Sequence, residues 1–132
     1  MREKPLILIV DDEEDFAEII SMKLQSGGCE TLFARNEAEA LKEAEAALPN
    51  LILMDIHMPG ATGTDVALSL KQNPKTHGIK VAFLSSMKDP WPRTLNNPDA
   101  LSKSLGMEAY IQKTEDLNVI AGKVTALLKN PA

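Results

Sequence analysis

The sequence predicts an α/β fold in which a doubly wound, five-stranded parallel sheet is covered by helices on both faces. Three observations lead to this class. Short apolar, β-rich runs alternate with stretches of helical period along the chain. The runs Leu6–Val10 and Leu51–Met54 are uninterrupted, which is typical of strands buried on both faces. Gly, Pro or N-capping residues separate the segments. Five strands alternating with five helices predict a parallel sheet with right-handed crossovers.

The first strand covers Leu6–Val10, and helical period begins at Glu13. One stripe of this helix is apolar and contains Phe16, Ile20 and Leu24, four residues apart, with Ala17 and Ile19 beside it. Gly27–Gly28 supplies the helix stop. A second strand is expected around Glu30–Ala34, and Cys29 at its start is expected to be a small buried hydrophobic residue.

Asn36 has the position of an N-cap for the second helix, with Glu39 as its capping-box partner, and Pro49 ends this helix. The third strand is the apolar run Leu51–Met54, which terminates at Asp55.

A loop at Met58–Gly60 then precedes a helix that Thr64 caps, and the fourth strand covers Ile79–Leu84. The segment 85–97 is expected to be a long irregular loop, because prolines interrupt it. A helix over 97–106 and a fifth strand over Glu108–Gln112 follow. The apolar face of the last helix contains Leu117, Ile120, Ala121, Val124, Leu127 and Leu128.

Length and charge exclude several kinds of protein. The 132 residues fit a single domain over 1–132. A net charge of -5 argues against a nucleic-acid surface, which needs clustered Lys and Arg. The single cysteine cannot form an internal disulfide, and no apolar run approaches the roughly 20 residues that span a bilayer. We therefore expect a cytoplasmic protein without membrane contact.

Polar residues gather where the predicted strands end. Asp11 and Asp12 follow the first strand, Asp55 the third, Ser85 the fourth and Lys113 the fifth. Adjacent parallel strands lie about 4.8 Å apart, so these side chains can converge on one pocket. Three crowded carboxylates repel one another, and a hard cation with oxygen ligands, most naturally Mg²⁺, resolves the repulsion. An aspartate after a strand is usually a helix cap when taken alone, but five suitable groups at one edge indicate a site.

The segments at these strand ends are Leu8–Asp12, Leu53–Gly60, Leu84–Ser86 and Tyr110–Lys113. Together they resemble the receiver domain of two-component response regulators over nearly the whole chain. The resemblance implies the flavodoxin-like strand order 2-1-3-4-5. It also implies a phosphorylation-dependent switch, which is not an enzyme although it assists its own phosphorylation and dephosphorylation.

The resemblance implies a role for each site residue. Asp55 would accept a phosphoryl group as an acyl phosphate. Mg²⁺ would be bound by Asp12, Asp55 and the backbone carbonyl of His57, with Asp11 reaching the ion through water. Lys113 would pair with Asp55 and later with the phosphoryl group.

Two further residues would form the switch. Ser85 would hydrogen-bond a phosphoryl oxygen, with Ser86 beside it as the alternative. Tyr110 would turn inward as Ser85 moves, and surface packing on an edge strand is its alternative. The donor would be a histidine kinase or a histidine phosphotransfer protein. A downstream protein of unspecified kind would recognise the face of strand four, helix four and strand five, and a homodimer is typical of the family.

The chain departs from the family pattern after Lys113, where Thr114 replaces the usual proline. A cis bond before a non-proline residue costs about 2.5–4 kcal/mol, so a trans bond and a differently shaped loop are expected. Thr114 is expected to cap the last helix.

The second departure is the unusually long loop at about 86–97. Its extra residues fall in Asp89–Thr94, and Trp91 among them is either a partner-docking or lid residue or a cover for the apolar edge of helix four.

Two other functions stay open. One is a pseudo-receiver, which would bind a partner without being phosphorylated. Thr114 and the long loop are compatible with this function, whereas the presence of the three aspartates, Ser85 and Lys113 argues against it. An aspartyl-nucleophile phosphatase would need an Asp-x-Asp-x-Thr motif after the first strand, where this chain has the five acids of Asp11–Asp15. Nucleotide and flavin binding are excluded, because no phosphate-binding loop is present and consecutive acids repel phosphate.

Overall fold

The computed structural model describes residues 4–55, 57–58, 61–85, 109–113 and 115–129. The predicted loop after Ser85, with Trp91, and the predicted helix over 97–106 lie outside the described residues. No described helix is long and apolar enough to cross a membrane.

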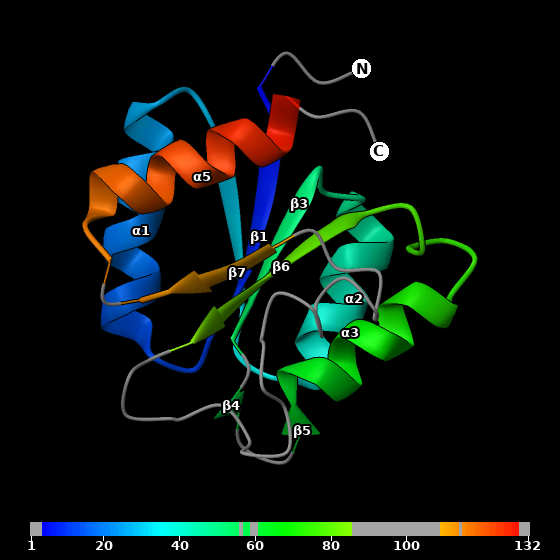
Figure 1. Cartoon of the computed structure of the whole chain (residues 1–132). Helices are drawn as coiled ribbons and strands as arrows, with labels where there is room; N and C mark the ends of the chain where they lie inside the picture. The colour runs from blue at the N-terminus through cyan, green and yellow to red at the C-terminus, as the bar shows by residue number, and fades with distance from the viewer. Residues whose placement is uncertain (1–3, 56, 59–60, 86–108, 114, 130–132) are drawn as a thin grey trace.

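Five parallel strands form one sheet with helices on both faces, as the sequence predicts. The strands are β1 (Leu6–Val10), β2 (Glu30–Ala34), β3 (Leu51–Asp55), β6 (Lys80–Ser85) and β7 (Ala109–Gln112). Their order is β2-β1-β3-β6-β7, which confirms the predicted order 2-1-3-4-5. The described helices are α1 (Glu14–Ser26), α2 (Glu37–Ala47), α3 (Gly63–Gln72) and α5 (Leu117–Lys129). Helices α1 and α5 lie on one face, and α2 and α3 lie on the other (Figure 1).

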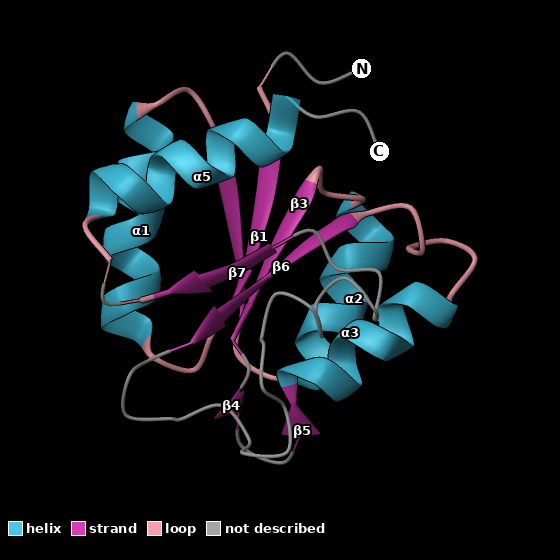
Figure 2. Cartoon of the chain, viewed as in Figure 1, coloured by secondary structure: helices cyan, strands magenta, loops and turns pink. Residues whose placement is uncertain are grey.

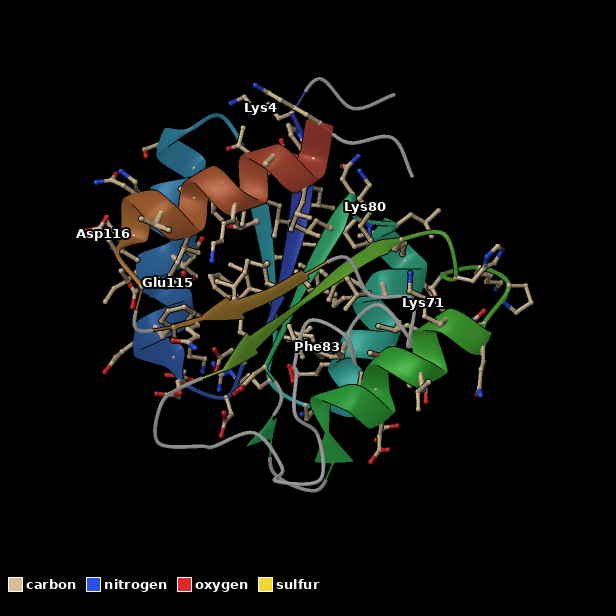
Figure 3. All side chains as sticks on the ribbon, in the orientation of Figure 1. Lys4, Lys71, Lys80, Phe83, Glu115 and Asp116 are labelled. Carbon is tan, nitrogen blue, oxygen red and sulfur yellow. The ribbon has the colours of Figure 1, made fainter. Side chains whose placement is uncertain are left out.

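Alternate side chains of the central strands pack into two separate hydrophobic cores, one on each face of the sheet. In β1, Leu8 and Val10 pack on the side of α2 and α3, whereas Ile7 and Ile9 pack on the side of α1 and α5. Phe83 of β6 lies in the core beneath α2 and α3 (Figure 3). Each of these side chains is fully buried, and such burial contributes about 1.5–3 kcal/mol per side chain. Burial on both faces explains why the sequences of β1 and β3 are apolar without alternation.

The register of the ladders brings the carboxyl ends of the strands to one edge of the sheet. The last paired residues are Val10 with Met54, Asp55 with Leu84, and Ser85 with Gln112. Figure 2 shows β6 and β7 ending side by side at this edge. The residues that follow these strands therefore leave the sheet close together, as the sequence predicts.

The cap predicted for α2 is confirmed. Asn36 Oδ1 accepts a hydrogen bond from the Glu39 backbone N–H at 2.9 Å. In return, the Glu39 carboxylate accepts a hydrogen bond from the Asn36 side-chain amide at 3.3 Å. This second bond therefore joins the two side chains and does not involve the Asn36 backbone N–H. Leu48, with φ 48°, ends the helix directly before Pro49, where a continuing helix is sterically disfavoured.

Burial differs from the expectation at two positions, Ile19 on the first helix and Cys29 directly before β2. The sequence places both Ala17 and Ile19 beside the apolar stripe, but Ile19 is 49 % exposed, whereas Ala17 is buried together with Ile20 and Leu24. Consecutive helical residues are rotated by about 100°, so a neighbour of Ile20 can fall outside the buried stripe. Cys29 is a free thiol that is partly buried rather than fully buried, and burial raises its pKa.

The approach to α3 also differs from the prediction. Where a plain loop was expected, β4 (His57–Met58) pairs with β5 (Ala61–Thr62) as an antiparallel hairpin. This hairpin leads directly into α3 at Gly63, so Thr64 lies inside the helix and is not its cap.

The last helix begins later than predicted. It starts at Leu117, and Asp116 Oδ1 accepts a hydrogen bond from the Asn118 backbone N–H at 2.8 Å. The cap assigned to Thr114 therefore belongs to Asp116, and Thr114 itself lies outside the described residues. The predicted apolar face of this helix is confirmed, with Ile120 and Val124 fully buried.

Candidate functional site

Three aspartates meet at the carboxyl edge of the sheet. Asp11 and Asp12 follow β1, and Asp55 is the last residue of β3, the strand paired with β1. Asp11 and Asp55 are each 3 % exposed, whereas Asp12 is open to solvent. One carboxylate oxygen from each lies within 4.8 Å of the others. The predicted convergence of these three residues is confirmed.

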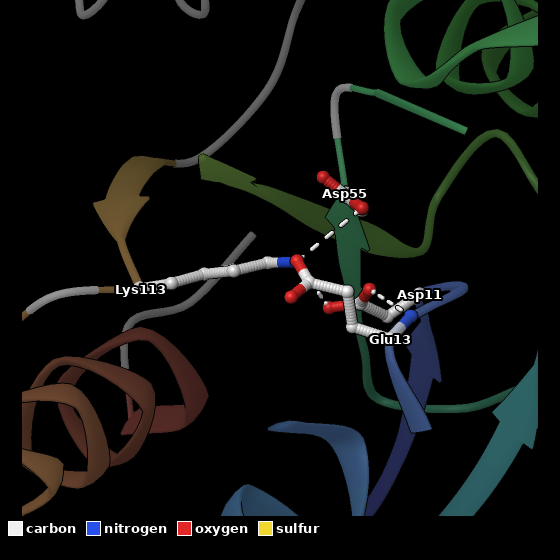
Figure 4. A network of polar contacts seen from close by, with 4 residues as sticks. All are labelled: Asp11, Glu13, Asp55 and Lys113. Carbon is white, nitrogen blue, oxygen red and sulfur yellow. Dashed lines mark hydrogen bonds and ion pairs between the residues drawn. The ribbon is translucent and has the colours of Figure 1, made fainter. Parts of the chain in front are cut away.

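Lys113 reaches this cluster from the end of β7. Its Nζ lies 2.7 Å from Asp11 Oδ2, 2.7 Å from Glu13 Oε1 and 3.4 Å from Asp55 Oδ2. Figure 4 shows the lysine extending across the edge of the sheet toward these carboxylates. Nζ also lies 5.1 Å from the centroid of the Phe16 ring, within the range of a cation–π contact. The Lys113 side chain is only 6 % exposed, so its charge is compensated by these neighbours rather than by water.

The surroundings of Lys113 favour its protonated, positively charged form. Burial by itself lowers the pKa of a lysine, but the contacts with Asp11, Glu13 and Asp55 outweigh it, and the pKa of Lys113 is raised above its ordinary value. Among the described residues, the ammonium group of Lys113 faces those three carboxylates, with Asp12 close by. The described part of the site therefore carries an excess of negative charge, which favours a further cation.

One carboxylate oxygen of Asp11 is hydrogen-bonded to the loop backbone, and the other faces Lys113. Its Oδ1 accepts a hydrogen bond from the Glu13 backbone N–H at 2.9 Å, which fixes the carboxylate at the start of α1. Its Oδ2 is buried and accepts no well-aligned hydrogen bond within the described part of the chain; its close contact with Lys113 is an ion pair. A buried carboxylate oxygen with spare acceptor capacity, beside two further carboxylates, suits a hard divalent ion such as Mg²⁺.

The remaining predicted site residues are placed by their backbone. Ser85 is the last residue of β6 and pairs with Gln112, the residue that precedes Lys113 in the sequence. Ser85 therefore lies at the same edge of the sheet as Lys113. Tyr110 lies further back along β7, and His57 lies in β4. The side chains of Ser85, Tyr110 and His57 lie outside what the structure describes, so their roles stay predictions.

Among the described carboxylates of the site, Glu13 is the one that sequence reasoning missed. Within an unbroken run of acids, nothing in the residue types distinguishes it from Glu14. The structure separates them, because Glu13 contacts Lys113 whereas the Glu14 carboxylate pairs with Arg35 at 2.8 Å. The available signal was position, since Glu13 precedes the helix and shares the loop of Asp11 and Asp12.

Comparisons with known proteins agree with this geometry. The family described as response regulator receiver domain matches residues 7–125. The chain is 32 % identical to the CAI-1 autoinducer sensor kinase/phosphatase CqsS of Vibrio cholerae, over 95 % of this chain and 18 % of that protein. It is 28 % identical to the alkaline phosphatase synthesis transcriptional regulatory protein PhoP of Bacillus subtilis, over 93 % of this chain and 48 % of that protein. The chain therefore spans less than half the length of either relative.

A solved structure shows the same architecture. The response regulator TrrA of Thermotoga maritima, in complex with Mg²⁺-BeF, superposes with a TM-score of 0.75 at 28 % identity. The match covers 93 % of this chain and 98 % of that one.

Proposed function

The chain belongs to the response regulator receiver domain family of two-component systems, and on that premise we propose that it is a signalling switch turned on by phosphorylation of Asp55. One observation carries the proposal. Asp55 is a buried carboxylate whose oxygen lies 3.4 Å from the ammonium group of Lys113, beside the carboxylates of Asp11 and Asp12.

In the proposed reaction, an Asp55 carboxylate oxygen attacks the phosphorus atom of the donor. A bond forms between this oxygen and phosphorus as the bond between phosphorus and the donor's leaving group breaks, which leaves an acyl phosphate. Lys113 pairs with the oxygens of the transferred group, and Ser85 donates a hydrogen bond to one of them. Tyr110 turns inward as Ser85 moves, which changes the surface around β6 and β7.

Receiver domains bind Mg²⁺ at an acidic pocket, and the aspartate cluster of this chain fits that ion. We assign its ligands to Asp12, Asp55 and the backbone carbonyl of His57, with Asp11 bound through a water molecule. When bound, Mg²⁺ neutralises the charge on the phosphoryl oxygens, which is most of what phosphoryl transfer asks of a protein.

Receiver domains receive their signal from histidine kinases or histidine phosphotransfer proteins, and we propose one of these as the donor. The output is a change in affinity for a downstream protein, or for a second copy of this chain, at the face of β6 and β7. Two further proposals are that residues 1–132 form one receiver domain and that the long loop at about 86–97 contributes to this face.

The test is covalent labelling with radioactive acetyl phosphate. We expect the wild-type protein to take up label in the presence of Mg²⁺ and to take up none when EDTA is added. The label should be released by hydroxylamine, which cleaves acyl phosphates. Absence of label at saturating Mg²⁺ contradicts the proposal and favours a pseudo-receiver, whereas continuous release of phosphate from a phosphate ester favours a phosphatase.

Replacing Asp12 by Asn should separate metal binding from folding. The variant should bind Mg²⁺ more weakly by at least about 10-fold, the lower limit seen even for outer-shell partners of a metal. Without Mg²⁺ it should be more stable than wild type by about 1 kcal/mol, because one of three mutually repelling carboxylates is neutralised. Mg²⁺ titration and urea unfolding in EDTA measure the two effects.

The matched control is Asp15→Asn, in the first turn of α1. This change removes the same charge from the same acidic run, but Asp15 is not part of the cluster. Its Mg²⁺ affinity should stay near wild type, and its stability should fall slightly, since an acid at a helix N-terminus is favourable. Equal losses of Mg²⁺ affinity in both variants would show that Asp12 is not a ligand.

A further inference from the structure

The carboxylate of Glu13 is the feature that the proposed function does not use. We propose that Glu13 is a positioning residue: it holds the Lys113 ammonium group in a resting place, and the phosphoryl group on Asp55 has to draw Lys113 away from it. This inference rests on the proposed function and adds a regulator of the same site.

The distances show that Lys113 is held more closely by the β1–α1 loop than by the acceptor. Its Nζ lies 2.7 Å from Asp11 Oδ2 and 2.7 Å from Glu13 Oε1, the usual length of a strong charge-assisted contact. The 3.4 Å to Asp55 Oδ2 is beyond that range. Figure 4 shows Glu13 and Asp55 approaching the same end of the lysine side chain.

Glu13 has no evident task in the helix that it precedes. It occupies the N-cap position of α1 with an extended backbone, φ -87° and ψ 95°, but its side chain makes no capping hydrogen bond. Glu14 and Asp15 already place negative charge in the first turn. The contact of the Glu13 carboxylate is instead with Lys113, at the far end of the sequence.

Of the two close partners of Lys113, Glu13 is the one that can be displaced. The side chain of Asp11 is 0 % exposed, and its second oxygen is tied to the backbone of the loop. The side chain of Glu13 is 59 % exposed, so water can solvate its carboxylate once Lys113 has left. Glu13 therefore acts as a removable competitor of the phosphoryl group for Lys113, whereas Asp11 is a fixed part of the site.

The test compares Glu13→Gln with Glu14→Gln. Both variants remove one acid from neighbouring positions, but the Glu14 carboxylate pairs with Arg35 and not with Lys113. The probe is beryllofluoride, which imitates the phosphoryl group on an aspartate. It is titrated into each protein at saturating Mg²⁺. Glu13→Gln should bind beryllofluoride about two- to fivefold more tightly than wild type, the size expected for an ion pair with one exposed partner. Glu14→Gln should be unchanged.

A second readout follows the lysine itself. In the absence of beryllofluoride, we expect the NMR chemical shift of Lys113 Nζ to differ from wild type in Glu13→Gln and to equal the wild-type value in Glu14→Gln. Thermal unfolding should be similar in all three proteins, which separates positioning from a general effect on the fold. Equal beryllofluoride affinity in the two variants, or weaker binding in Glu13→Gln, overturns the inference while the proposed function stands. Failure of the wild type to bind beryllofluoride contradicts the proposed function, and the inference with it.

Discussion

Replacing Asp55 by Asn should reduce covalent labelling by acetyl phosphate to background while the protein stays folded. The amide retains the shape of the side chain but lacks the anionic oxygen that attacks phosphorus. Folding should tolerate the change, because it removes one of the carboxylates that crowd the edge of the sheet. Uptake of label, measured beside urea unfolding of the same preparation, distinguishes loss of the acceptor from loss of the fold.

The neighbouring acids supply the control. Asp12 has a carboxylate oxygen within 4.8 Å of one from Asp55, and it is the more exposed of the two. If Asp55→Asn keeps its label, the acceptor lies elsewhere, and peptide mapping would identify Asp12 or another acid. Asp15→Asn, which removes an acid from the same loop–helix junction without touching the cluster, should label like wild type.

The predictable part of the molecule is the part governed by short-range pattern. Strands such as Leu6–Val10 and Leu51–Asp55 are predictable because burial on both faces leaves a run with no polar residue before its end. The polar residue that ends each run is then conspicuous. Alternation of strands with helices fixes the common edge at which these residues meet. The cluster of Asp11, Asp12 and Asp55 follows from these two rules alone.

The unpredicted part depends on where side chains point after the strands have ended. The predicted pair of Lys113 with Asp55 is present at 3.4 Å, but nothing in the sequence indicates the closer contacts of Lys113 with Asp11 and Glu13. Helix period cannot decide whether a residue just before the first turn, such as Glu13, faces the site or the solvent. The hairpin at 57–62 is likewise invisible to hydrophobic pattern, because two-residue strands are too short for a period to appear.

Replacing Lys113 by Met should be the most destabilising change at the site. The ammonium group is the buried positive charge among the carboxylates of Asp11, Glu13 and Asp55. Removing one partner of a buried ion pair leaves the others uncompensated and typically costs 3–5 kcal/mol. Because Glu13 is exposed, we expect the lower end, about 3 kcal/mol, by urea unfolding in EDTA. Labelling at Asp55 should fall as well.

The pH dependence of this contribution follows from the raised pKa of Lys113. A group whose pKa is higher in the folded than in the unfolded state stabilises the fold fully at any pH below its unfolded-state pKa, which is about 10.4 for lysine. The contribution is lost as the pH rises through the folded-state pKa. Unfolding measured at pH 7 therefore reports the whole effect. The difference between wild type and Lys113→Met should shrink only in strongly alkaline solution.

Lys123→Met is the matched control, since Lys123 also pairs with an acid, Glu115, at 2.6 Å. Its side chain is 43 % exposed, so this loss should stay within about 1 kcal/mol. Mg²⁺ should restore more stability to Lys113→Met than to the control, because the ion supplies positive charge to the same carboxylates that the lysine had compensated. Equal stability of the two variants in EDTA would mean that Lys113 does not neutralise the cluster. An equal gain on adding Mg²⁺ would mean that the ion and the lysine compensate different charges.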